Sequence, residues 1–143
     1  MAANPTITVY DSGDIIDNYN PSYKMVYKEG ESNIVILDVW NSKGDATATT
    51  ASNVTITTST PTAITDATVA TVVSGKWYNV KCTTYGDVNW TAVGGTTTKA
   101  IGSASAVQTI TANAKAVVQT KLSVPSTATS GWYVFNIVIA YEY

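Results

Sequence analysis

Hydrophobic and polar positions alternate along most of this chain, and the alternation is clearest over residues 131–143. In that segment every odd-numbered position from 133 onward is apolar or aromatic, whereas the even-numbered positions include Asn136 and Glu142. Side chains alternate between the two faces of a strand, and β-branched and aromatic residues favour strands. We therefore predict a closing strand that buries its odd-numbered face and pairs with residues 115–124 across the turn at Pro125.

Similar runs, bounded by turn residues such as Gly, Pro, Asn and Asp, predict further short strands. Residues 33–40 are apolar on both faces, which is typical of a strand in the middle of a sheet. We find no amphipathic segment with helix start and stop signals. Many short strands with turns between them predict an all-β, antiparallel β-sandwich. The other predicted strands cover residues 5–10, 22–27, 53–58, 66–73, 77–82, 88–93, 106–111 and 115–124.

The length of 143 residues predicts one domain with a sizeable core. We expect residues 21–143 to form the sandwich and residues 1–20 to form an N-terminal arm, because turn residues and Pro21 set that segment apart. Such an arm docks on, or is exchanged with, a neighbouring subunit. The arm and the even-numbered face of the closing strand predict an assembly interface made of Ile7, Val9, Tyr10, Ile15, Ile16, Tyr19, Trp132 and Val134.

Charge is scarce in this chain. Charged residues make up 13% of it and the net charge is -2, so Thr, Ser, Asn and Gly must supply most of the polar surface. The sequence has no His and no Arg, and its lysines are scattered along the chain. Because nucleic-acid-binding proteins neutralise phosphates with basic patches, no nucleic-acid partner is expected. The N-terminus lacks a signal-peptide pattern, and no apolar run has the length of a membrane helix, so no Sec export and no membrane partner are expected.

No set of residues has the spacing of a catalytic, metal or cofactor site. Without His or Arg, an acid, base or nucleophile would have to come from carboxylates, hydroxyls or Lys, and nothing marks such a pair. We therefore expect no enzyme activity, no cofactor and no small-molecule substrate. The carboxylates of Asp11, Asp14 and Asp17 fit a solvated turn better than a calcium site. Cys82 is the only cysteine and is expected to be a small buried apolar side chain.

The aromatic residues allow two interpretations. One is a platform for sugar rings, which would make the protein a carbohydrate-binding module. The other is core and interface packing, which is favoured because Trp77 and Trp90 lie in strand-like runs. The residues concerned are Trp77, Tyr78, Tyr85, Trp90 and Trp132.

Residues 41–46 form an Asn-x-x-Gly-Asp-Ala turn, followed by Asn-Val-Thr-Ile-Thr at 53–57 and by Pro61. Near the C-terminus, Val-Pro at 124–125 precedes Gly-Trp-Tyr at 131–133. Over residues 33–143 this cadence resembles immunoglobulin-like repeat domains of cell-surface and archaeal proteins, of the CARDB and conserved-repeat type. The resemblance implies an Ig-like β-sandwich that displays or joins other structures and has no catalytic residues.

The first 32 residues have no counterpart in those repeats. A single Ig-like domain with an N-terminal arm is more similar to virion accessory proteins of phages. That resemblance implies a structural protein that decorates a phage capsid, is made in the host cytoplasm and is located in the virion. Its partners would be a major capsid or other virion protein and copies of itself, such as a homotrimer. Two alternatives stay open: a secreted or cell-surface filament or adhesin module assembled by strand addition, and a carbohydrate-binding module.

Overall fold

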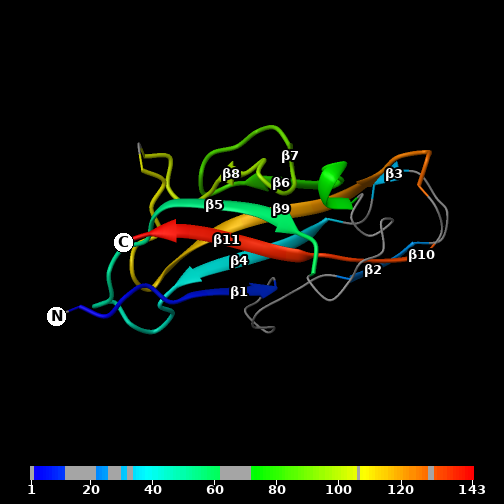
Figure 1. The fold of residues 1–143 in the computed structure, drawn as a ribbon. Coiled ribbons are helices and arrows are strands. Elements are labelled where there is room, and N and C mark those ends of the chain that lie inside the picture. The colour runs from blue at the N-terminus through cyan, green and yellow to red at the C-terminus, as the bar shows by residue number, and fades with distance from the viewer. Residues whose placement is uncertain are drawn as a thin grey trace.

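The computed structural model describes residues 2–11, 22–25, 30–31, 34–61, 72–105, 107–128 and 131–143, with the backbone alone at 11, 22–25, 30–31 and 131–134. These residues are mostly strand, and the strands pair antiparallel. They form a sandwich-like arrangement of two main sheets (Figure 1). The prediction of an all-β, antiparallel sandwich-like fold is confirmed.

The larger sheet has the order β1-β4-β9-β6-β7. Its longest strand, β9 (Ala114–Val124), is paired on both edges, with β4 (Val35–Asn41) and with β6 (Tyr78–Cys82). The prediction that residues 33–40 belong to a strand inside a sheet is confirmed, because β4 lies between β9 and β1. The remaining strands of this sheet are β1 (Ile7–Asp11), β7 (Thr91–Val93) and the short β3 (Gly30–Glu31), which pairs with the end of β9.

The second sheet has the order β11-β5-β8, with β5 (Ser52–Ser59) in the middle, β11 (Asn136–Glu142) on one side and β8 (Lys99–Ala100) on the other. A separate pair joins β10 (Gly131–Val134) to β2 (Ser22–Met25). In Figure 1, β5 and β11 run beside the strands of the larger sheet along the length of the molecule. Apolar side chains between the two sheets form the core.

Alternation along β9 shows how the core is built. Ala116, Val118 and Leu122 are fully buried, and the intervening positions point away from the core. Thr120 is the polar exception, and its hydroxyl donates to the Val35 carbonyl at 2.8 Å. Because that bond satisfies the buried hydroxyl, Thr120 is tolerated in an apolar layer.

The closing segment is divided at Phe135, which is fully buried and packs against Tyr78 with ring centroids 5.1 Å apart and the ring planes tilted by 59°. Ile137, Ile139 and Tyr141 pack against the core, so the predicted inward direction of these odd-numbered positions is confirmed. The predicted pairing with residues 115–124 is wrong, because β11 pairs with β5 and β10 pairs with β2. Both edges of β9 are already occupied, so the chain crosses after Pro125 instead of forming a hairpin.

Two other predicted strands differ from the structure. Of residues 66–73, only 72–73 are described, and they begin a helical turn over 72–74 in which Trp77 N–H donates to the Val72 carbonyl. Residues 107–111 do not form a regular strand: Ile110 makes an isolated bridge with Ala51, and the Val107 and Gln108 carbonyls accept from the N–H groups of Asn53 and Val54. Burial of Val72 and Ile110 in the core, rather than strand propensity, determines both conformations.

The described part of the predicted arm is integrated into its own chain. Residues 7–11 form β1 at the edge of the larger sheet. The segment before β1 is held by hydrogen bonds from Ser42 N–H to the Thr6 carbonyl and from Thr49 N–H to the Ala3 carbonyl, each 2.8 Å long. Exchange of the arm with a neighbouring subunit stays a prediction.

A buried amide organises the end of the sandwich where two loops meet. The Asn41 side-chain nitrogen donates to the Thr49 carbonyl at 3.0 Å and to the Ile110 carbonyl at 2.8 Å. Its amide oxygen accepts from the Ser42 hydroxyl at 3.0 Å. Asn41 is 0% exposed, so these bonds form away from competing water.

We expect Asn41→Ala to lower the free energy of unfolding by about 2 kcal/mol, because two partly buried carbonyls each lose a donor. Urea unfolding followed by fluorescence measures the change. Asn89→Ala is the matched control at an exposed position and should stay within about 0.5 kcal/mol of the parent. Equal effects of the two substitutions would show that Asn41 does not organise the loops.

Candidate functional site

The outward face of the larger sheet carries most of the described lysines. These side chains come from positions that alternate with the core residues on β9 and β6, and from two turns beside the sheet. We call this surface the lysine face and define it by Tyr10, Asp38, Trp40, Lys43, Lys76, Asn79, Lys81, Trp90, Lys115, Lys121 and Ser123.

Strand pairing gathers residues that are far apart in the sequence. Lys121 lies opposite Asn79 in the pairing of β9 with β6, and Lys81 lies opposite Gln119. The lysines are scattered along the sequence. In the structure the residues next to Lys81, Lys115 and Lys121 point into the core, so these three lysines lie on the same outward side of the sheet. A search for lysines at the positions between core residues would have found this signal.

Trp90 is the centre of the first cluster on the lysine face. It is half-buried, and the ammonium groups of Lys81 and Lys121 lie 5.0 and 4.4 Å from its ring centroid. Cation–π attraction holds an ammonium group near a ring without neutralising its charge. This cluster therefore places two ammonium groups beside one aromatic ring.

The second cluster lies around Trp40. Lys43 is 4.5 Å from the ring centroid of Tyr10 and 5.3 Å from that of Trp40, and Lys115 is 5.5 Å from Trp40. Here one charge is balanced, since Lys115 also forms a 3.1 Å ion pair with Asp38, whose side chain is only 6% exposed. The Trp40 cluster is thus less cationic than its two lysines suggest.

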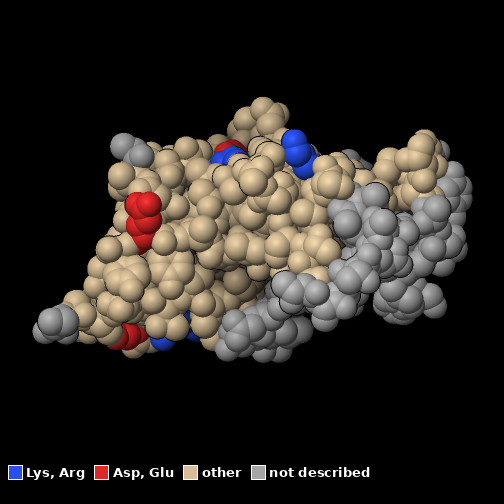
Figure 2. All heavy atoms as spheres, viewed as in Figure 1, with Lys and Arg blue, Asp and Glu red and all other residues tan. Residues whose placement is uncertain are grey.

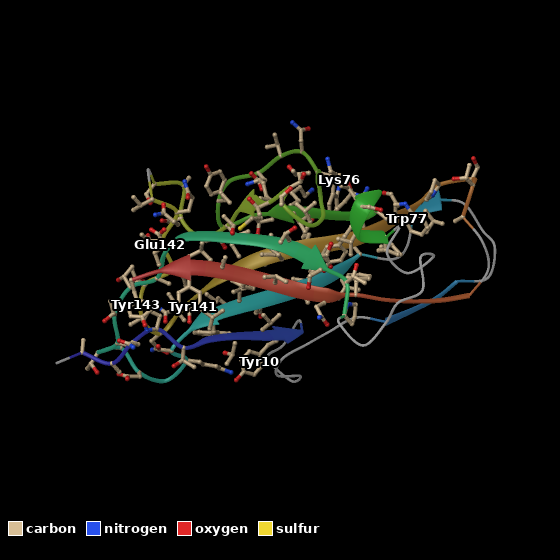
Figure 3. All side chains as sticks on the ribbon, in the orientation of Figure 1. Tyr10, Lys76, Trp77, Tyr141, Glu142 and Tyr143 are labelled. Carbon is tan, nitrogen blue, oxygen red and sulfur yellow. The ribbon has the colours of Figure 1, made fainter. Side chains whose placement is uncertain are left out.

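An open cleft of about 460 Å³ lies next to the Trp90 cluster. Its polar side chains are Lys76, Asn79 and Ser123, and Trp77, Ala92, Val124 and Pro125 supply apolar surface. Figure 3 shows Lys76 and Trp77 together at the turn that precedes β6. The cleft combines one cation, hydrogen-bonding groups and an apolar wall, which is the composition of a binding site for a polar ligand.

Lys76 adopts an unusual backbone conformation at this cleft. Its φ is +54°, a left-handed value that glycine adopts most readily. The value follows from the end of the helical turn, where Lys76 N–H donates to the Val73 carbonyl and Trp77 N–H to the Val72 carbonyl, each at 3.1 Å. A non-glycine residue here holds strain, and such strain is concentrated at functional sites.

The opposite side of the sandwich has a different chemistry. The outward positions of β5 and β11 carry Thr55, Val138 and Ala140, and Glu142 at the end of β11 accepts a 2.6 Å hydrogen bond from the Asn53 amide. Figure 2 shows this side as almost uncharged, with the few charged groups mainly near its margins. A neutral surface can be buried against a partner at little desolvation cost.

The structure describes the side chains of only some of the residues predicted to form the assembly interface. Ile7 and Val9 pack against the core of their own chain, whereas Tyr10 lies under the Lys43 ammonium. Trp132 and Val134 belong to β10, whose side chains are not described, and Ile15, Ile16 and Tyr19 lie outside the described residues. The structure therefore does not bring these residues into one described surface, and the interface stays a prediction.

The aromatic residues divide between core and surface. Trp77 and Tyr78 are 8% and 0% exposed, so the packing interpretation is confirmed for both. Tyr85 is half-buried under Lys99, 4.0 Å from its ring centroid, and Trp90 lies on the lysine face. The side chain of Trp132 is not described. Cys82 is fully buried, as expected.

The carboxyl group of Asp45, in the turn that follows β4, has a lowered pKa. Hydrogen bonds from the Thr47 hydroxyl and the Thr47 N–H to Asp45 hold the pKa of that carboxyl below its usual value, and its slight desolvation opposes them. The group stabilises an exposed turn that follows β4. It lines a small hollow with Lys43, Tyr10 and the N-terminal segment.

Among the described residues no group of His, Cys, Asp and Glu side chains is arranged to hold a metal ion. Of the aspartates predicted to form a solvated turn, Asp14 and Asp17 lie outside the described residues and Asp11 is described by its backbone alone. No helix in the described part of the chain is long and apolar enough to cross a membrane.

Comparison of the chain with known protein families, with curated proteins and with solved structures found no match. The resemblance to Ig-like repeat domains therefore stays a prediction.

We expect Lys115→Met to lower the free energy of unfolding by about 1–2 kcal/mol, because the buried Asp38 carboxylate loses its cation. The effect is smaller than for a fully buried pair, since the Lys115 side chain is 37% exposed and partly screened by water. Thermal and urea unfolding measure it.

The double variant Asp38→Asn/Lys115→Met should recover most of that loss, because no buried charge remains. Lys81→Met is the control for a lysine that contacts a ring, and it should cost no more than about 0.5–1 kcal/mol. If the double variant were as unstable as Lys115→Met, charge burial at Asp38 would not be the cause.

Proposed function

We propose that this chain is a non-enzymatic structural protein that acts as a subunit of a larger assembly, and that the assembly is a phage particle whose capsid it decorates. The observation that carries the proposal is the pair of edge strands, β1 in the larger sheet and β11 in the second sheet. Among the described strands, β1 pairs only with β4, and β11 pairs only with β5. Each is therefore an edge strand among the described residues, and edge strands are where a sheet most readily extends onto a partner chain.

The two edge strands lie on the same side of the sandwich. Asn4, just before β1, donates from its side-chain nitrogen to the Tyr143 hydroxyl, just after β11, at 3.1 Å. Figure 3 places Tyr141, Glu142 and Tyr143 at that end of β11, beside the N-terminal segment. Exposed edges are ready templates for pairing with another chain, and natural monomers usually protect them with charge, proline or bulges.

Protection of the β11 edge is weak. The register of its pairing with β5 is irregular only between Ala140 and Glu142, and Glu142 is the only charged residue of the strand. Its outward neighbours Val138 and Ala140 are small and apolar. Main-chain pairing at this edge, with the neutral surface of β5 and β11 beside it, supplies contact area without buried unpaired charge.

The phage assignment rests on the resemblance to virion accessory proteins and on the low charge of the chain. A decoration protein of this kind would be found in the virion, after synthesis in the host cytoplasm, bound to a major capsid protein and to copies of itself, such as a trimer. Such a protein acts by burying its surface against its partners and needs no catalytic residues. This agrees with a sequence in which no set of residues has the spacing of a catalytic site.

A second candidate is a filament or adhesin module at the cell surface, assembled by strand addition. The place of β11 at the end of the described order of its sheet favours it, because an extended segment from the next subunit can add to an edge strand through main-chain hydrogen bonds. The location of the protein distinguishes the two candidates: co-purification with phage particles supports decoration, and recovery from the cell surface supports the filament.

We expect the full chain to co-sediment with phage particles purified from its source, at a constant number of copies per particle. Ala140→Lys should weaken that binding at least about tenfold, because a charge at the strand edge opposes pairing. Quantitative mass spectrometry of gradient fractions measures the copies, and light scattering measures the oligomeric state of the free protein.

Val88→Lys is the matched control, since Val88 is 82% exposed in the loop between β6 and β7. Both variants should unfold within about 0.5 kcal/mol of the parent, because both positions are exposed. A protein that is monomeric in solution and absent from both particles and cell surface would overturn the proposal.

A further inference from the structure

The core of the sandwich is incompletely covered along one margin. Ile137, Ile139 and Tyr141 of β11 pack against the core, yet each keeps part of its surface exposed. Ile7 and Val9 of β1, on the same side of the sandwich, are also only partly buried. Along β9, in the middle of the larger sheet, most inward side chains are fully buried. The incomplete cover therefore belongs to the margin where β1 and β11 end the described order of their sheets.

The hydrogen bonds of β5 show which main-chain groups of β11 point outward. The Val54 carbonyl accepts from the N–H of Ile101, the residue after β8, at 2.9 Å. Main-chain groups alternate between the two edges of a strand, so Ile56 also faces β8. Because Ile139 lies opposite Ile56 in the register, its N–H and C=O groups point away from β5. Those of Tyr141, two residues further along the same strand, point in the same direction.

We propose that two copies of the chain meet at this edge, with β11 pairing antiparallel to β11 of a second copy about a two-fold axis at Ala140. In this register Ile139 lies opposite Tyr141 of the second copy, and the outward main-chain groups of the two residues bond to each other. The two β11-β5-β8 sheets become one continuous sheet. The inference rests on the proposed role of the chain as a subunit of an assembly, and it names the contact between two of those subunits.

The residues of β11 suit pairing of the strand with itself about this axis. On the core side, both symmetric pairs bring an aromatic ring against a β-branched side chain, which is a favourable cross-strand combination. On the outer face, Ala140 meets its own copy, and its methyl group permits the α-carbon separation of about 4.5 Å in such a pair. Glu142 lies opposite Val138 of the second copy, so the two carboxylates do not face each other. Its own chain holds that carboxylate through the Asn53 amide, at 2.6 Å.

A second copy is favoured over a partner recognised by charge. Glu142 is the only charged residue of β11, and the outer face beside it is almost uncharged (Figure 2). A charged partner would therefore find few groups to pair with, whereas two identical neutral surfaces meet without repulsion. Because the same strand contributes from both sides, the contact is isologous and closes after two copies.

The first test is analytical ultracentrifugation of the purified full chain in the absence of particles, from about 1 µM to about 1 mM. We expect a reversible equilibrium between monomer and dimer. Its dissociation constant should be about 1–100 µM, because one pair of short strands forms a small interface.

Ala140→Lys places two ammonium groups against each other at the axis and should raise the dissociation constant at least about tenfold. Thr55→Lys is the matched control, since Thr55 lies opposite Ala140 on β5 and carries the same charge on the same outer face, one strand away from the edge. It should change the dissociation constant less than about threefold, because water and salt screen the more distant charges. Both variants should melt within about 4 °C of the parent.

Ala140→Cys tests the register. Two cysteines that face each other at the axis lie within disulfide distance, so mild oxidation should link most of the chains into covalent dimers. Val138→Cys is the control, because its two copies lie four residues apart along the paired strands, about 13 Å, which is beyond disulfide reach. The native Cys82 is fully buried and does not compete. Non-reducing electrophoresis measures the yield of linked dimer.

A chain that stays monomeric at about 1 mM, or that forms trimers without dimers, would overturn the inference even if it co-sediments with phage particles. Equal weakening by Ala140→Lys and Thr55→Lys, or equal disulfide yields from Ala140→Cys and Val138→Cys, would overturn it as well. A dimer with the expected cross-link, formed by a chain that is absent from particles and cell surfaces, would support this contact and remove the proposed role. The two conclusions can thus fail separately.

Discussion

Pairing of β9 on both of its edges is the constraint on which the rest of this structure depends. Its alternation buries Ala116, Val118 and Leu122 and sends Lys115 and Lys121 to the other side of the sheet. A slip of one residue would exchange the two sets and place lysines in the core. The same register that builds the core therefore fixes the position of the lysine face.

The two outer faces of the sandwich differ in charge and in shape, and they therefore suit different kinds of partner. The surface of β5 and β11 is almost uncharged and ends, among the described strands, at the edge strand β11, which suits broad contact with another protein. The lysine face has localised charge, aromatic rings and a cleft, which suits a smaller polar ligand.

Local strain and buried polar groups are concentrated where the loops meet the sheets. Asn41 joins two loops through a fully buried amide, and Lys76 accepts a left-handed backbone at the cleft. Each is compensated differently: Asn41 by complete hydrogen bonding, and Lys76 by the bonds that close the helical turn. The pattern of apolar residues in the sequence does not identify Asn41 or Lys76, because neither the buried amide nor the left-handed backbone depends on hydrophobicity.

The sequence by itself determined the all-β class, most strand positions and the inward direction of residues such as Ile137 and Val118, because a period of two is a local property of the chain. It also indicated the buried state of Cys82. Only the tertiary structure decided the partners of each strand. The choice of β5 rather than β9 for the closing strand, the helical turn at Val72 and the meeting of Lys81 with Lys121 around Trp90 all depend on pairings between distant segments. Such pairings follow from the joint filling of one core, and no local pattern encodes them.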